Sequence, residues 1–190
     1  VQQADGATLR AVTNFYGGAM GFDRQVRPDL RIGGFAGAGT TRQDIDTNSG
    51  HTDSDIVFGG VYGRWSPGVT FVDVALSGGL SRNAIMRNIA NNLAAGGMET
   101  AKADTGGWFV SPALSVGYRI PLTGSLALTP SAYLRYVAAG LGGYAESGSS
   151  ANLTVGARTM QDVEERGELK LAQTTSFDGV AQLRTSVHVG

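Results

Sequence analysis

Hydrophobic and polar residues alternate along most of this chain of 190 residues. In residues 108–136, which read WFVSPALSVGYRIPLTGSLALTPSAYLRY, the even positions carry nearly all of the large apolar side chains. The odd positions are mostly small or polar, with Phe109 and Tyr133 as bulky exceptions. A period of two is typical of β-strands that have one apolar and one polar face. The stretch therefore predicts two such strands joined by a short turn.

The same alternation recurs elsewhere, and we predict eight strands in all. Two of them contain an internal proline, Pro112 and Pro130. Because a proline removes one hydrogen bond from the ladder, we expect a bulge or a membrane-interface position at each. The predicted strands are residues 15–24, 30–39, 56–65, 71–81, 108–118, 126–136, 166–172 and 180–189.

The connections between these strands alternate between short and long. The short ones, VRPD, SPGV, PLTGS and TTSFDG, carry the proline, glycine and aspartate that tight turns need. The long ones are residues 40–55, 82–107 and 142–165. All short turns therefore lie at one end of an up-and-down meander, and all long loops at the other. Outer-membrane β-barrels have this asymmetry, with short periplasmic turns, whereas the crossing connections of soluble sandwiches rarely produce it.

Composition narrows the class of protein further. The 15 basic and 16 acidic side chains nearly cancel, which argues against a nucleic-acid partner. There is no cysteine, so disulfides, thiolate metal sites and cysteine nucleophiles are excluded. No apolar run approaches the ~18 residues of a transmembrane helix. Many of the 29 glycines lie inside the alternating runs, where a flexible linker does not explain them.

Membrane lipid is the environment that we expect for the apolar face. A sheet in hydrocarbon must close on itself, since each unsatisfied backbone group there costs several kcal/mol. The fold predicted is thus all-β, an antiparallel up-and-down transmembrane β-barrel. Aromatic residues near the strand ends fit the girdles that such barrels place at the two membrane interfaces. These residues are Trp65, Trp108, Tyr118 and Tyr136.

Charged residues of the opposite face are predicted to line the barrel lumen, where water and ion pairing make charge tolerable. The alternative is the solvated face of a soluble sheet. The candidate lumen residues are Arg31, Arg64, Asp73, Arg119, Arg135, Arg166, Glu168, Lys170 and Arg184.

Two long loops contain patterns that suggest chemistry at first sight. Asp44, Asp46, Asn48 and Asp55 resemble a calcium-binding loop, but Ser49 stands where that motif needs glycine, and an aspartate replaces its final glutamate. His51 lies near Asp53 and Asp55, and outer-membrane proteases place aspartate and histidine on extracellular loops, yet no serine lies in a G-x-S-x-G elbow. We therefore interpret residues 40–55 as a polar surface loop and expect no catalytic residue, metal or cofactor.

The loop of residues 82–107 has apolar residues every four positions, at Ile85, Ile89 and Leu93. This spacing is compatible with a short helix that folds over or into the barrel mouth. A long surface loop is the alternative.

The order and spacing of these segments are similar to the β-barrel translocator domain of autotransporters, the type V secreted proteins of Gram-negative bacteria. The similarity covers roughly residues 15–172 and rests on three segments, GGAMGFDRQVRPDLRIGGFAGAG, DIVFGGVYGRWSPGVTFVDVALSGG and SPALSVGYRIPLTGSLALTPSAYLRY. The residues that carry it are Gly17, Gly21, Asp23, Gly60, Tyr62, Trp65, Pro112, Tyr118, Pro130 and Tyr136.

The resemblance implies a twelve-stranded barrel in the bacterial outer membrane, inserted by the barrel-assembly machinery. Such a barrel is a conduit and anchor for export of its own N-terminal passenger, without chemistry of its own. Family members hold a linker helix inside the barrel and end in an aromatic residue, whereas this chain has a short segment before Phe15 and ends in SVHVG. We therefore expect residues 1–190 to form a single β-barrel domain that lacks strands at one or both ends.

Two other classes of protein stay open on the residues alone. One is a small structural or adhesive outer-membrane barrel that transports nothing. The other is a soluble β-barrel or sandwich that binds a partner and buries the apolar face as an ordinary core. Dependence on detergent separates the soluble class from the membrane classes, and a passenger upstream separates the two membrane classes.

Overall fold

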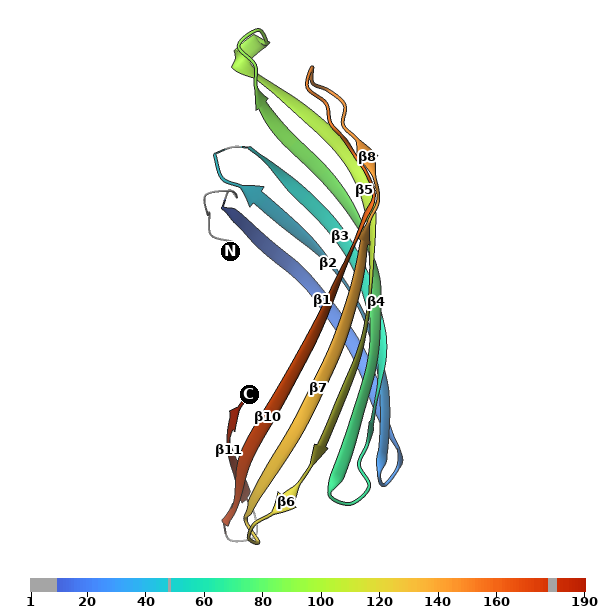
Figure 1. Ribbon diagram of the computed structural model, residues 1–190, viewed down its shortest axis with the longest axis vertical. Helices are drawn as coiled ribbons and strands as arrows, with labels where there is room; N and C mark the ends of the chain where they lie inside the picture. The colour runs from blue at the N-terminus through green and yellow to red at the C-terminus, as the bar shows by residue number, and fades with distance from the viewer. Residues whose placement is uncertain (1–9, 48, 178–180) are drawn as a thin grey trace.

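The computed structural model describes residues 10–47, 49–177 and 181–190. Most of them belong to one antiparallel sheet of long strands that curves along its whole length (Figure 1). The long strands are β1 (Ala11–Arg27), β2 (Leu30–Ile45), β3 (Gly50–Trp65), β4 (Thr70–Ala90), β5 (Met98–Tyr118), β7 (Leu126–Leu141), β10 (Arg158–Phe177) and β11 (Ala181–Val189). The short elements are the 3₁₀ turn η1 (Ala95–Gly97) and the strands β6 (Ile120–Pro121), β8 (Tyr144–Ala145) and β9 (Thr154–Val155).

The topology is an up-and-down meander, as the alternating connections predict. The strand order in the sheet is β1-β2-β3-β4-β5-β7-β10-β11, and every pair is antiparallel. The short turns lie together at one end of the sheet and the long hairpins at the other (Figure 1). Among the described strands, β1 and β11 each pair along one side only, so the sheet is an open, curved wall. The eight predicted strands and their order are confirmed.

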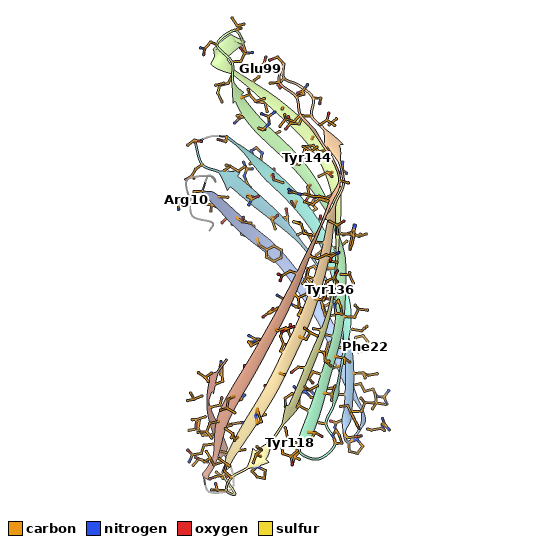
Figure 2. The ribbon with its side chains drawn as sticks, in the orientation of Figure 1. Arg10, Phe22, Glu99, Tyr118, Tyr136 and Tyr144 are labelled. Carbon is orange, nitrogen blue, oxygen red and sulfur yellow. The ribbon has the colours of Figure 1, made fainter. Side chains whose placement is uncertain are left out.

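The strand register sorts the apolar and polar positions onto opposite faces of this wall. Phe22 pairs with Gly34, Gly34 with Val61, Val61 with Leu76, and Leu76 with Pro112. Figure 2 shows Phe22 on the convex side of the sheet, and we call the face that carries this row the outer face. The other face, which carries the charged positions predicted above, is the inner face.

The outer face leaves large apolar side chains uncovered. Phe22 is 78% exposed, Leu80 63% and Val61 61%, and no large side chain of the described residues is fully buried. A soluble protein rarely exposes so extensive an apolar surface, because each such side chain forgoes about 1.5–3 kcal/mol of burial. The soluble alternative, in which this face is a protein core, is therefore not supported.

On the inner face, aromatic rings lie over glycines of neighbouring strands. Phe58 covers Gly37, and a Cβ added to that glycine would lie 2.5 Å from the ring. Phe109 lies equally close to a Cβ placed on Gly79. Rings that cover glycines in this way stabilise curved sheets while the glycine relieves crowding on the concave side. The abundance of glycine inside the strands is explained by this packing.

The strands of the long-loop end extend much further than the sequence predicts. β4 continues to Ala90 and β5 begins at Met98, so the helix expected around Ile85 and Ile89 is wrong. Only η1 has helical character there, and Leu93 is 97% exposed rather than packed over the barrel mouth. Beyond the apolar band each face of β4 mixes polar and apolar residues, so the alternation that marks a strand in the sequence is lost.

The predicted loop of residues 40–55 is also largely strand. Its connection shortens to the residues between Ile45 and Gly50, of which Asn48 lies outside the described part. Likewise β10 spans Arg158–Phe177 instead of residues 166–172. Val180, the predicted first residue of the last strand, lies outside the described residues.

The two prolines are accommodated differently from one another. Pro112 pairs with Leu76 of β4. The β5–β7 register is the same on both sides of this proline, but the two residues that lie between Val110 and Ala113 have no pairing partner in β7. The bulge prediction is therefore wrong for Pro112, whose missing N–H only interrupts the ladder to β7. Pro130 lies just beyond the last β5–β7 pair, Gly117 with Ser131, where the ladder to β5 ends.

Candidate functional site

Seven of the nine predicted lumen residues gather around one hollow near the short turns. It has a volume of about 540 Å³ and lies between the β3–β4 turn and the strands β5, β7, β10 and β11. Five cations and two carboxylates line it, so its net charge is positive. These residues are Arg64, Asp73, Arg119, Arg166, Glu168, Lys170 and Arg184.

The other two predicted lumen residues lie on the same face, outside this hollow. Arg31 pairs with Arg64 in the register and lies in a neighbouring hollow with it. Arg135 lies further along β7, one alternate position beyond Tyr133. The structure thus brings the nine candidates to one face of the wall, and their role in lining a lumen stays a prediction.

Ion pairs and ring contacts hold several of these arginines in place. Arg64 donates two hydrogen bonds to Asp73, from Nε to Oδ1 and from Nη2 to Oδ2, both 2.5 Å. The guanidinium of Arg64 also lies 5.3 Å from the ring centre of Phe71. Arg166 lies over Tyr133 in the same way, at 5.2 Å. Paired and stacked guanidinium groups of this kind are ordered more tightly than lysines on a free surface.

Two acidic residues of the inner face that pair with these arginines are absent from the predicted lumen residues. Asp23 Oδ2 lies 3.1 Å from Nη1 of Arg31, and Glu164 Oε2 lies 2.8 Å from Nη2 of Arg135. Both carboxylates lie at the alternate positions of their strands that face inward. Extending the alternation along the full length of each strand would therefore have placed them on this face. Their pairing partners follow only from the register between strands.

The four aromatic candidates all lie at outer-face positions. Trp65, Trp108 and Tyr118 are each a little under half exposed, and Tyr136 is half-buried. Trp65 and Tyr118 lie next to the short turns, and the indole Nε1 of Trp65 donates a 2.8 Å hydrogen bond to Asp29. Trp108 and Tyr136 lie further toward the long hairpins. Their placement at membrane interfaces stays a prediction.

At the long-loop end, a buried ion pair joins two elements that are distant in sequence. Arg87 of β4 donates to both carboxylate oxygens of Glu146, at 3.0 and 2.6 Å. Glu146 is 8% exposed and also accepts the backbone N–H of Leu153, at 2.8 Å. The hydrogen bonds from Arg87 hold the pKa of the Glu146 carboxyl below its usual value.

Further contacts fasten the segment between β7 and β10 against the β4–β5 hairpin. Lys102 of β5 forms a β-bridge with Ser147, and Glu99 accepts hydrogen bonds from the backbone and hydroxyl of Ser150. The bonds from Ser150 lower the pKa of Glu99. The sequence prediction assigned both segments to loops and so missed this contact.

The motifs suggestive of chemistry are dispersed along strands. Asp44 pairs with His51, whereas Asp55 pairs with Thr40, four positions further along β2. The candidate calcium ligands therefore do not form one continuous loop as the motif requires. His51 Nε2 lies 3.6 Å from Asp53, and Arg42 Nε lies 3.1 Å from Asp44, as in an ordinary polar surface cluster.

In the part of the chain that the structure describes, no helix is both long and apolar enough to cross a membrane. An all-β sheet with one apolar and one polar face, and with its turns segregated by length, is the architecture of an outer-membrane β-barrel wall. The comparisons with known proteins give the family.

The family model of the autotransporter β-domain matches residues 2–190, and the chain belongs to this family. Among solved structures, the chain is similar to the translocator domain of the autotransporter NalP from Neisseria meningitidis. The TM-score is 0.73 at 18% identity, over 97% of this chain and 62% of that one. No curated protein sequence matches. The chain is thus an autotransporter β-domain of the bacterial outer membrane, and it spans less than two thirds of the length of this structural relative.

Proposed function

We propose that this domain is the membrane conduit and anchor through which its protein exports an N-terminal passenger to the cell surface. The single observation that carries the proposal is the division of one continuous wall into an apolar outer face and a charged inner face. A wall of this kind separates lipid from a polar passage. Membership of the autotransporter β-domain family supports the same function.

The complete barrel includes strands outside the ones described. The unpaired edges of β1 and β11 would expose backbone N–H and C=O groups in hydrocarbon, which is too costly to persist. Strands that precede β1 or follow β11 in the protein would close the barrel at twelve strands. Residues 1–190 are then one part of a single barrel domain.

In the closed barrel the inner face lines the lumen, and the four aromatic residues mark the interfaces of the membrane. The polar wall surrounds a translocating segment without binding it tightly, because most of its guanidinium groups already have a carboxylate or ring partner. The domain performs no catalysis of its own. Its partners are outer-membrane lipid, the barrel-assembly machinery and the passenger.

Protease access in intact cells tests this proposal. An epitope is inserted in the segment upstream of the domain in the full-length protein, and external proteinase K is added. We expect removal of the epitope without cell lysis. An epitope that stays protected, while the domain itself is inserted and heat-modifiable on gels, would contradict export and favour a purely structural barrel.

The matched controls use the glycines of the two faces. Gly37→Val is expected to reduce the amount of inserted barrel and so the fraction of epitope that is removed, because its Cβ would meet the Phe58 ring and a backbone oxygen at 2.5 and 2.7 Å. Gly18→Ala meets no atom within 4 Å and is expected to export normally. A protected epitope in both variants would indicate a defect unrelated to the barrel wall.

A further inference from the structure

The outer face of β1–β4 contains an apolar hollow with a volume of about 590 Å³. Gly34 and Gly63 form its floor, and Phe22, Val61 and Leu76 stand around it. The volume lies within the ~300–1,000 Å³ typical of small-molecule sites. A Cβ added to Gly63 would approach no atom closer than 3.7 Å, so it would make only ordinary van der Waals contacts.

Arg24 lies at the rim of this hollow. Its pairing with Ile32, which pairs in turn with Gly63, places it on the outer face. It is exposed, and no described residue forms an ion pair or hydrogen bond with it. Arg31, one strand away on the inner face, is by contrast paired with Asp23 at 3.1 Å.

An arginine without an ion-pair partner among the described residues needs a counter-ion on a lipid-facing surface. Its cost is about 2–4 kcal/mol at the membrane midplane and falls to about 0–1 kcal/mol near the interface. Arg24 lies on the short-turn side of Phe22, within four residues of Pro28 in the β1–β2 turn. Its side chain can therefore extend toward the periplasmic headgroups, where phosphate is the abundant anion.

We propose that this hollow binds one anionic phospholipid of the periplasmic leaflet, with its phosphate on Arg24 and an acyl chain over Gly34 and Gly63. The guanidinium matches phosphate in charge and can bind two of its oxygens at once. The apolar walls and the floor of glycines, which carry no side chains, suit a flexible hydrocarbon chain. The inference rests on the proposed lipid-facing role of the outer face.

Native mass spectrometry of the full-length protein in detergent tests the site, with phosphatidylglycerol and phosphatidylethanolamine as the added lipids. We expect the wild type to retain phosphatidylglycerol in preference to phosphatidylethanolamine. Arg24→Gln should lower phosphatidylglycerol retention about tenfold, which corresponds to the loss of one charge-assisted contact. Arg24→Lys should restore part of it.

The floor and the charge are tested separately. The Cβ of Gly63→Val makes only ordinary contacts, and its side chain should fill the hollow and reduce retention of both lipids to the same degree. Arg27→Gln is the matched control, since Arg27 lies on the same strand beside Asp29 at 4.0 Å and outside the hollow. It should leave retention unchanged.

Equal retention of the two lipids by the wild type, or unchanged phosphatidylglycerol retention in Arg24→Gln, would overturn the proposal. Heat-modifiable gel mobility is measured on the same samples. If the mobility shift persists while lipid preference is absent, the lipid site is wrong and the barrel assignment stands. If the mobility shift itself is absent, the proposed membrane function is wrong, and the lipid site that rests on it is wrong as well.

Discussion

Glycine occurs on both faces of the sheet, for opposite reasons. On the inner face, Gly37 lies under the ring of Phe58 and Gly117 under that of Phe71, so any side chain would collide with an aromatic ring. On the outer face, a Cβ on Gly18 would meet nothing within 4 Å, and one on Gly63 only ordinary contacts. At these positions the inner face fills its own space, whereas the outer face leaves space for its surroundings. Gly140 is an outer-face exception, because an added Cβ there would meet the indole of Trp108.

This difference shows where each face finds its stabilising partners. Inner-face side chains find them within the protein, as rings over glycines and as arginine–carboxylate pairs. Outer-face side chains depend on an apolar solvent, since their large groups are exposed. Substitutions on the inner face should therefore cost more than comparable ones on the outer face.

The largest effect is expected from an added side chain on the inner face. Gly37→Val forces the Phe58 ring out of its position and should destabilise the barrel by about 3 kcal/mol or more. Gly18→Ala on the outer face should stay within about 0.5 kcal/mol of the wild type. The temperature at which the gel mobility shift is lost measures both. Equal stability of the two variants would contradict the claim that substitutions on the inner face cost more than those on the outer face.

The next effect concerns the buried ion pair of Arg87 and Glu146. Glu146→Gln removes the charge that holds Arg87 and should loosen the β8–β9 segment by about 2 kcal/mol. Hydrogen exchange of residues 144–155 should speed up, while exchange in the middle of β4 and β5 stays unchanged. Uniform acceleration of exchange along the whole sheet would show that the ion pair stabilises the entire sheet and not this segment alone.

The same carboxylate makes the long-loop end sensitive to acid. The pKa of Glu146 is lower in the folded protein than its ordinary unfolded value of about 4.3. Its stabilising contribution is therefore complete above that unfolded value and is lost as the pH falls through the lower folded value. Exchange of residues 144–155 should accelerate in that acidic range in the wild type and not in Glu146→Gln. Acceleration that is identical in both would assign the pH dependence to other groups.

The smallest effect is expected for the exposed inner-face pair of Arg64 and Asp73. Their side chains are 57% and 30% exposed, so solvent screens the interaction to about 0.5–1 kcal/mol. A double-mutant cycle with Arg64→Gln and Asp73→Asn should give a coupling of this size that decreases with added salt. A coupling of several kcal/mol would mean that the lumen wall is much drier than its exposure indicates.

The alternation of residues was sufficient to predict the strands, their order and the two faces within the apolar band. The alternation did not predict the strand extensions at the long-loop end, where the two faces no longer differ in polarity. From Arg82 onward each face of β4 carries a mixture of polar and apolar residues, and the strand is held by its hairpin with β5, which a hydrophobic pattern cannot reveal. The contact of Glu146 with Arg87 joins residues 59 positions apart, and it depends on tertiary packing that local patterns do not encode.

The most direct test of the central claim, that this wall belongs to a closed membrane barrel, is the gel mobility of the full-length protein in SDS. Samples prepared with and without detergent are compared unheated and boiled. We predict that unheated protein prepared in detergent migrates faster than boiled protein, and that without detergent it aggregates. A monodisperse, detergent-free protein without a mobility shift would contradict the account, because the outer face would then have to be covered by protein.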